Sequence, residues 1–81
     1  MKITFSKKAE KQLNKIPDWV FDHILTKIKD LANQTGSLDI KKLASREGYR
    51  LRVGDYRVIY KPSKTELTVL SVSHRKDAYR K

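Results

Sequence analysis

Apolar and polar residues alternate at the start of this 81-residue chain and again over its second half. Between these two stretches, apolar residues recur every three or four positions. Alternation places successive side chains on opposite faces of a strand, whereas spacings of three and four residues place them on one face of a helix. The pattern predicts strands at 2–5, 49–53, 56–61 and 66–73, and helices at 7–16 and 18–34. The order βααβββ predicts a single α+β domain spanning 1–81, in which an N-terminal helical hairpin packs on one face of a small antiparallel β-sheet.

Three residues mark the expected ends of the helices. Ser6 is a suitable N-cap for the first helix, and Pro17 breaks that helix and can occupy the start of the second. Gly36 is a natural C-terminal stop. The positions expected to face the core are Ala9, Leu13 and Ile16 on the first helix and Val20, Ile24, Ile28, Leu31 and Ala32 on the second.

The second half of the chain begins with a polar connection at 37–48. Gly54-Asp55 then predicts a tight hairpin turn, and 62–65 predicts another. If Gly54 and Asp55 are the two turn residues, Arg52 stands opposite Arg57.

Positive charge is concentrated in this second half. The chain has 19 lysines and arginines against 9 acidic residues, a net charge of +10. Residues 1–40 carry a net +2 and residues 41–81 a net +8. Such asymmetry indicates a polyanionic partner, with nucleic acid the first choice and an anionic membrane surface the second. A basic surface with no such partner is the plainer alternative.

Three arginines in the segment 49–60 are the best candidates for binding a phosphate. Arg50 and Arg52 share one face by their two-residue spacing, and whether Arg57 joins them depends on a strand register that sequence does not determine. Three adjacent positive charges destabilise a sheet unless an anion is bound. A solvated face of unrelated arginines is the alternative.

Several classes of function are disfavoured by the composition. The chain has no cysteine, so disulfides and cysteine-ligated zinc are ruled out. His23 and His74 are far apart in sequence, and we expect no metal and no cofactor. No segment has the apolar length of a signal peptide or membrane span, so we expect a cytoplasmic protein without a membrane partner.

Aromatic and basic residues also mark the end of the chain. Arg75 and Tyr79 would share one side of a helical tail, where the arginine could bind a phosphate and the tyrosine could stack on a base. Loose packing on the sheet is an equal alternative for Tyr79, and a structural role is the plainer interpretation of His74. Trp19, Phe21 and His23 are core or helix-surface residues, or else part of a docking site for a protein.

The segments YRLRVGDYRVIY at 49–60 and HRKDAYR at 74–80, with Lys42-Leu43 before them, resemble the RelE/ParE toxin superfamily. The resemblance spans nearly the whole chain, and the terminal His-Arg…Tyr favours the RelE branch. It implies a microbial-RNase-like fold and a metal-independent, ribosome-dependent mRNA endonuclease that cuts in the A site. It also implies a toxin of a type II toxin–antitoxin system, with a cognate antitoxin as partner.

Carried over residue by residue, the family's basic catalytic row falls on Arg50, Arg52 and Arg57. Its C-terminal arginine falls on Arg75, and its base-stacking tyrosine on Tyr79. The implied reaction is attack of a ribose 2′-hydroxyl on the adjacent phosphate, which gives a 2′,3′-cyclic phosphate. Proton transfer and positive charge around the phosphorane would assist it.

The sequence departs from the family where well-known members have lysines in place of Arg50 and Arg52. Arginine is effectively always protonated, so these two residues are better suited to phosphate binding than to proton transfer. His74 then becomes a candidate base, and Lys76 and Arg80 are further candidates for RNA binding. Two alternatives stay open: a ParE-like toxin that inhibits DNA gyrase, and a basic nucleic-acid-binding module without catalysis.

Overall fold

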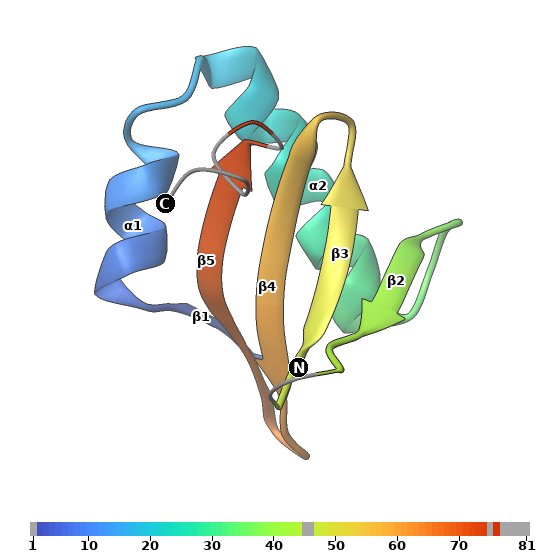
Figure 1. Cartoon of the computed structure of the whole chain (residues 1–81). Helices are drawn as coiled ribbons and strands as arrows, with labels where there is room; N and C mark the ends of the chain where they lie inside the picture. The colour runs from blue at the N-terminus through green and yellow to red at the C-terminus, as the bar shows by residue number, and fades with distance from the viewer. Residues whose placement is uncertain (1, 45–46, 75, 77–81) are drawn as a thin grey trace.

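Five strands and two helices build the fold in a computed structural model that describes residues 2–44, 47–74 and 76 (Figure 1). The strands form one sheet in the order β1-β5-β4-β3-β2. The elements are β1 (Lys2–Phe5), α1 (Lys7–Leu13), α2 (Asp18–Asn33), β2 (Asp39–Lys42), β3 (Tyr49–Val53), β4 (Tyr56–Pro62) and β5 (Glu66–His74).

The sheet is mixed, and the expectation of an antiparallel sheet is therefore wrong for its first strand. β1 pairs in parallel with β5, with Ile3 opposite Leu67, whereas β2, β3, β4 and β5 are antiparallel neighbours. β1 is the first element of the chain, and its partner β5 is the last, so both helices and three strands separate the pair in sequence. A parallel pair requires such a long connection, and nothing in the alternation of β1 specifies its neighbour.

A strand that the sequence analysis missed lies inside the polar connection at 37–48. Asp39–Lys42 form β2, which pairs with β3 at the edge of the sheet. All four of its residues are exposed, and three are charged, so the segment lacks the apolar face by which strands are recognised. The element order is thus βααββββ rather than βααβββ.

The N-terminal end of α1 is as expected, and its C-terminal end is not. The Ser6 hydroxyl accepts a hydrogen bond from the Ala9 N–H at 3.1 Å and caps the helix. The helix ends at Leu13, four residues before Pro17, so it has about two turns rather than three. Ile16 lies outside the helix yet still packs against the core.

Helix α2 begins where it was expected to begin and ends slightly earlier. Pro17 is its N-cap, and the Pro17 carbonyl accepts the N–H groups of Val20 and Phe21. The helix stops at Asn33 because Gln34 adopts the left-handed conformation, with φ 56°. Gly36, the expected stop, also has a positive φ of 78°, but it follows the cap.

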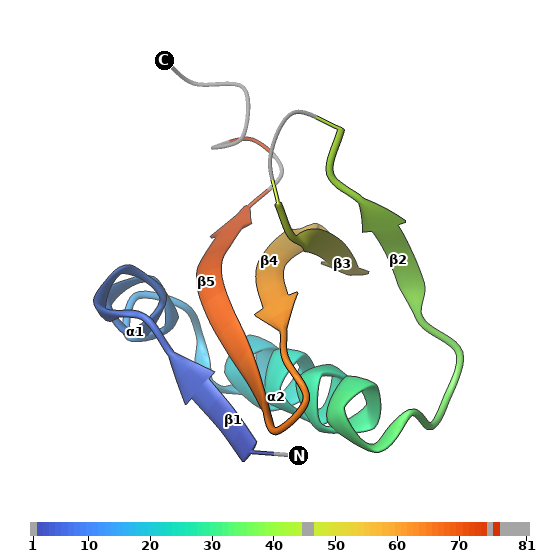
Figure 2. The ribbon, with the colours of Figure 1, turned by 90° about the horizontal axis from the view of Figure 1, so that it is seen from below.

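The two helices do not pack along one another as a hairpin. Figure 2 shows α1 end-on beside β5, while α2 runs beneath β4 and β3. α1 contacts mainly β5, and it completes the edge of that strand where β1 ends. The Gln12 side-chain oxygen accepts the Val72 N–H at 2.6 Å, and the Ser6 hydroxyl donates to the Leu70 carbonyl at 2.7 Å. α1 therefore satisfies backbone groups that would otherwise form a free sheet edge.

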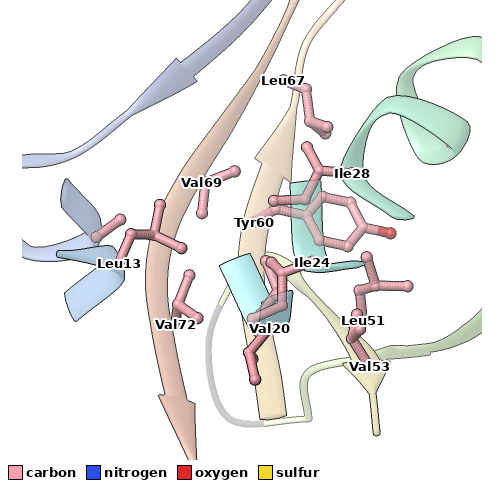
Figure 3. Packing of buried hydrophobic residues seen from close by; sticks show 12 residues of the cluster. Leu13, Val20, Ile24, Ile28, Leu51, Val53, Tyr60, Leu67, Val69 and Val72 are labelled. Carbon is pink, nitrogen blue, oxygen red and sulfur yellow. The ribbon is translucent and has the colours of Figure 1, made fainter. Parts of the chain in front are cut away.

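One apolar core lies between α2, α1 and the helix-covered face of the sheet (Figure 3). Ile24 and Ile28 of α2 are almost fully buried against Leu51, Val58 and Val69 of the sheet. Of the other positions expected to face inward, Leu31 and Ala32 are only partly buried. Neither of the described helices lies over the opposite face of the sheet, so side chains there point away from this core. In the part of the chain that the structure describes, no helix is long and apolar enough to cross a bilayer.

Candidate nucleic-acid interface

The β3–β4 hairpin has the register in which two arginines oppose each other. Gly54 and Asp55 are the turn, Val53 pairs with Tyr56, and Arg52 pairs with Arg57. Gly54 has a φ of 58°, a conformation that glycine adopts at little cost. The conditional expectation from the sequence is confirmed.

All three arginines of the hairpin lie on the face of the sheet opposite α1 and α2, the helices of the described residues. Leu51, Val53 and Val58 point into the core, so Arg50 and Arg52 on β3 and Arg57 on β4 point the other way. We call this side of the sheet the open face.

The three arginine side chains differ in burial and pairing. Arg52 is exposed, whereas Arg50 and Arg57 are half-buried. The Nη2 of Arg50 lies 3.2 Å from Oδ1 of Asp39 on β2. The Arg50 side chain is only 17% exposed, and its Nε is buried without a hydrogen-bond partner. A buried donor that lacks a partner is costly, so Asp39 satisfies only part of the hydrogen-bonding capacity of Arg50.

A shallow groove of about 300 Å³ adjoins these arginines on the side of β2. Its lining combines the two half-buried arginines with the end of β2 and the residues that follow. These residues are Lys41, Lys42, Leu43, Ala44, Arg50 and Arg57. Four cationic side chains therefore converge on one concave surface, which is the pattern that attracts polyanions.

His74 lies on the opposite face from the arginines. It pairs with Tyr56 at the end of β5, and the two rings meet edge to face with centroids 5.1 Å apart. Tyr56 packs against the core and precedes Arg57, so the pair faces the helices. The His74 Nδ1 accepts the Lys76 N–H at 3.2 Å, which leaves Nε2 to carry the proton of the neutral ring.

A β-bulge explains this orientation. Tyr60 pairs with Val69 and Ile59 with Ser71, so Leu70 is an extra residue on β5. Strict alternation from Val69 would turn His74 outward, toward the arginine side. The extra residue instead turns Val72 and His74 inward.

The two histidines, distant in sequence, line one apolar hollow of about 460 Å³ beside the hairpin turn. Its wall includes His23 and Trp19 from α2, with Tyr56 and His74 from the sheet. Trp19 is 76% exposed, so it is not a core residue, and Phe21 is partly buried against the core. Among the described residues, no group of three or more histidines, aspartates or glutamates could hold a metal ion.

The C-terminal candidates fall largely beyond the described part of the chain. Arg75, Tyr79 and Arg80 lie outside the described residues, and their predicted roles stay predictions. Lys76 is described and exposed, in a turn two residues beyond the end of β5.

Two tyrosines stack on the helix-covered face of the sheet. Tyr49 and Tyr60 pair across β3 and β4 with ring centroids 5.6 Å apart. Burial, and secondarily the neighbouring Tyr49, raise the pKa of the Tyr60 hydroxyl above its ordinary value. Nearby, Lys61 lies 2.7 Å from Glu47, and its hydrogen bond and charge lower the pKa of that exposed carboxyl.

The residues of β2 are the part of this site that sequence reasoning missed. Asp39 contacts Arg50, and Lys41 pairs with Arg50 across the strands. A weak signal was present, because Leu38 and Ile40 alternate with Asp39 and Lys41. That alternation is too short to distinguish a strand from a loop.

Comparison with known proteins places the chain in a family. The family model described as the ParE toxin of the type II toxin–antitoxin system parDE matches residues 3–79. Toxin RelE3 of Methanocaldococcus jannaschii is 32% identical over 84 residues, which cover 98% of this chain and 96% of that protein.

Solved structures agree with this placement. The RelB-RelE antitoxin-toxin complex from Methanococcus jannaschii has a chain with a TM-score of 0.78 and 30% identity, covering 94% of each chain. The archaeal RelE-RelB complex from Pyrococcus horikoshii OT3 gives a TM-score of 0.74 and 25% identity, covering 91% of this chain and 93% of that one. On this evidence the chain belongs to the RelE/ParE superfamily of toxins from toxin–antitoxin systems, on its RelE-like branch.

Proposed function

We propose that this toxin is a ribosome-dependent mRNA endonuclease that cuts in the A site and thereby inhibits translation. The observation that carries the proposal is the open face, where Arg50, Arg52 and Arg57 stand together on two rigid strands. Guanidinium groups bind phosphate through paired hydrogen bonds, and strands hold them in fixed positions.

The arginines suit the electrostatic part of the reaction. As a ribose 2′-hydroxyl attacks the adjacent phosphate, negative charge accumulates on the phosphorane oxygens, and fixed positive groups stabilise it. The directly opposed Arg52 and Arg57 offer such groups on both sides of one phosphate. The attack closes a 2′,3′-cyclic phosphate and breaks the bond to the 5′-oxygen of the next nucleotide, which leaves with a proton.

Proton transfer needs a group other than these arginines, which stay protonated at any physiological pH. His74 was the sequence-based candidate for the base. Its position on the helix-covered face, against Tyr56, argues against contact with a phosphate held by Arg52 and Arg57. Within the proposal, water or the ribosome accepts and donates the proton, and Arg57 or Arg75 stabilises the leaving oxygen.

The C-terminal residues complete the proposed site. Arg75 would bind the scissile phosphate and Tyr79 would stack on a base, as the family's pattern implies. Lys76 and Arg80 would add phosphate contacts. They follow β5 in sequence, and β5 ends at His74, opposite Tyr56 and next to the hairpin turn.

A cognate antitoxin is the proposed protein partner. The two archaeal relatives are described as complexes of RelE with RelB. The net charge of +8 over residues 41–81 fits an acidic, partly disordered peptide that folds as it binds.

A gyrase inhibitor is the second candidate function, and one observation favours it. The family model that matches the chain carries the ParE name, and the chain lacks lysines at the two positions where RelE-like nucleases have them. A basic RNA- or DNA-binding module without catalysis is the third.

One experiment separates the three functions. A defined mRNA is translated in vitro with the purified toxin and mapped by primer extension, and the same mRNA is incubated without ribosomes. New 5′ ends that appear at codon positions only with ribosomes support the proposal. Inhibition of gyrase supercoiling without new 5′ ends indicates the ParE-like function. Salt-dependent RNA binding without new 5′ ends or gyrase inhibition indicates the non-catalytic binding module.

A further inference from the structure

We propose that the groove between β2 and the hairpin arginines is a second phosphate-binding subsite, in which Lys41 and Lys42 act with Arg50. In this proposal, Asp39 forms an ion pair with Arg50 when no nucleic acid is bound, and RNA displaces it. This inference rests on the proposed function, because it extends the site that holds the scissile phosphate. It adds residues of β2 to the path of a single RNA strand.

The groove extends the open face from the Arg52–Arg57 pair toward β2, and Arg57 lines it as well as opposing Arg52. Arg50 is two residues along β3 from Arg52, about 7 Å at the rise of an extended strand. Lys41 pairs with Arg50 and shares the open face with it. Lys42 pairs with Tyr49, so alternation points it to the other face, but it lines the groove where β2 ends. The cationic surface therefore continues along the open face, far enough to meet a neighbouring phosphate of the same strand.

The state of Arg50 indicates that the subsite is built to exchange anions. Its side chain is 17% exposed and bonds the Asp39 carboxylate through Nη2, while its Nε is buried with no partner. A single carboxylate oxygen at 3.2 Å uses only part of the donor capacity of this side chain. A phosphate oxygen entering the groove could accept from the unpaired donors and displace Asp39.

The position of Asp39 makes this displacement inexpensive. Its side chain is 56% exposed on an edge strand, so it regains water when Arg50 turns to another anion. Asp39 also pairs in register with Arg52. It therefore lowers the repulsion between neighbouring arginines in the free protein and competes with RNA for one of them.

The test measures binding of a fluorescent single-stranded RNA of about eight nucleotides, 2′-O-methylated throughout so that it cannot be cleaved, by anisotropy over a range of salt concentrations. In Lys41→Ala/Lys42→Ala, the plot of log affinity against log salt should become shallower by about 1.4, because each lost single-strand phosphate contact removes about 0.7. Affinity at low salt should fall about tenfold, as expected for loss of two such contacts. Asp39→Asn should act in the opposite direction and raise affinity severalfold.

The control is Lys11→Ala/Lys15→Ala, which removes the same charge from exposed positions near α1, away from the open face. It should leave the salt slope unchanged. Circular dichroism and thermal melting of each variant confirm that the comparison is between folded proteins.

The outcomes distinguish the subsite from the function on which it rests. If the unmodified toxin binds the RNA with a steep salt slope but Lys41→Ala/Lys42→Ala behaves like the control, the subsite is disproved and the proposed function stands. If Asp39→Asn weakens binding, Asp39 is not a competing anion, and that part of the inference fails. If the unmodified toxin shows no salt-dependent binding, the subsite is disproved, and the proposed function is decided separately by primer extension on translated mRNA.

Discussion

Arg52 and Arg57 lie directly opposite each other on the open face of the β3–β4 hairpin. Opposed like charges destabilise a sheet, so this pair is a feature that stability alone does not favour. The hairpin tolerates it because Leu51, Val53 and Val58 bury the other face of the same two strands.

The first prediction concerns the stability of this pair. Replacing Arg52 with Gln removes the repulsion while keeping a long side chain, so the free energy of unfolding should rise by about 0.2–1 kcal/mol. Urea unfolding at low ionic strength measures the change, and added salt should diminish it by screening. A loss of stability at low salt would show that Arg52 has a favourable contact instead.

A second prediction concerns His74. Replacing it with Phe keeps a ring against Tyr56 and removes both nitrogens. The rate of mRNA cleavage should change by less than about threefold, because His74 faces away from the arginines. Loss of a true general base would lower the rate by roughly a hundredfold or more. Primer extension on in vitro translated mRNA provides the rate. A drop of that larger size would mean that His74 reaches the substrate despite its position on the helix-covered face.

Gln12 gives a third prediction, this time for the edge of the sheet. Its side-chain oxygen accepts the Val72 N–H at 2.6 Å, on the β1 side of β5 and beyond the last residue that pairs with β1. Gln12→Ala leaves that N–H without its partner and should lower the free energy of unfolding by about 1–3 kcal/mol. Lys11→Ala, an exposed neighbour on the same helix, is the matched control and should change stability much less. Equal effects in the two variants would contradict the role given to Gln12.

Tyr60 gives a prediction for alkaline pH. Its pKa in the folded protein is raised above the value near 10 of an unfolded chain, chiefly by burial. The contribution of the neutral Tyr60 hydroxyl to the free energy of unfolding is therefore fully present below about pH 10. It is lost as pH rises through the folded-state pKa, since Tyr60 ionises at lower pH in the unfolded chain.

Thermal melts between pH 8 and pH 12 test this dependence. Tyr60→Phe should lose less stability than the unmodified protein over that range, and Tyr56→Phe tests the effect of removing a hydroxyl elsewhere on β4. If the alkaline loss is the same in Tyr60→Phe as in the unmodified protein, ionisation of Tyr60 is not its cause.

The parts of the fold that local sequence specifies were predictable. Ser6 caps α1 because its hydroxyl can reach the Ala9 N–H, and the Gly54-Asp55 turn fixes the register that opposes Arg52 to Arg57. Each of these depends on residues within a few positions of one another, so the sequence contains the information directly.

The features that the sequence did not reveal depend on contacts between distant segments. β2 is a strand only because β3 lies beside it, and the parallel pairing of β1 depends on the position of β5. The face occupied by His74 depends on the extra residue Leu70, and alternation within 66–74 does not reveal the bulge. For the candidate site, the arginines were therefore predictable, while Asp39 and Lys41 and the orientation of His74 were not.

The central claim is that the open-face arginines hold the RNA phosphate that is cleaved. Its most direct test is primer extension on a defined mRNA during in vitro translation, comparing Arg57→Ala with Lys29→Ala, which removes one charge from an exposed position on α2. We predict that ribosome-dependent cleavage falls about a hundredfold or more in Arg57→Ala, as when a group that stabilises transition-state charge is removed, and is unchanged in Lys29→Ala. Cleavage that persists at the unmodified rate in a folded Arg57→Ala protein would contradict the claim.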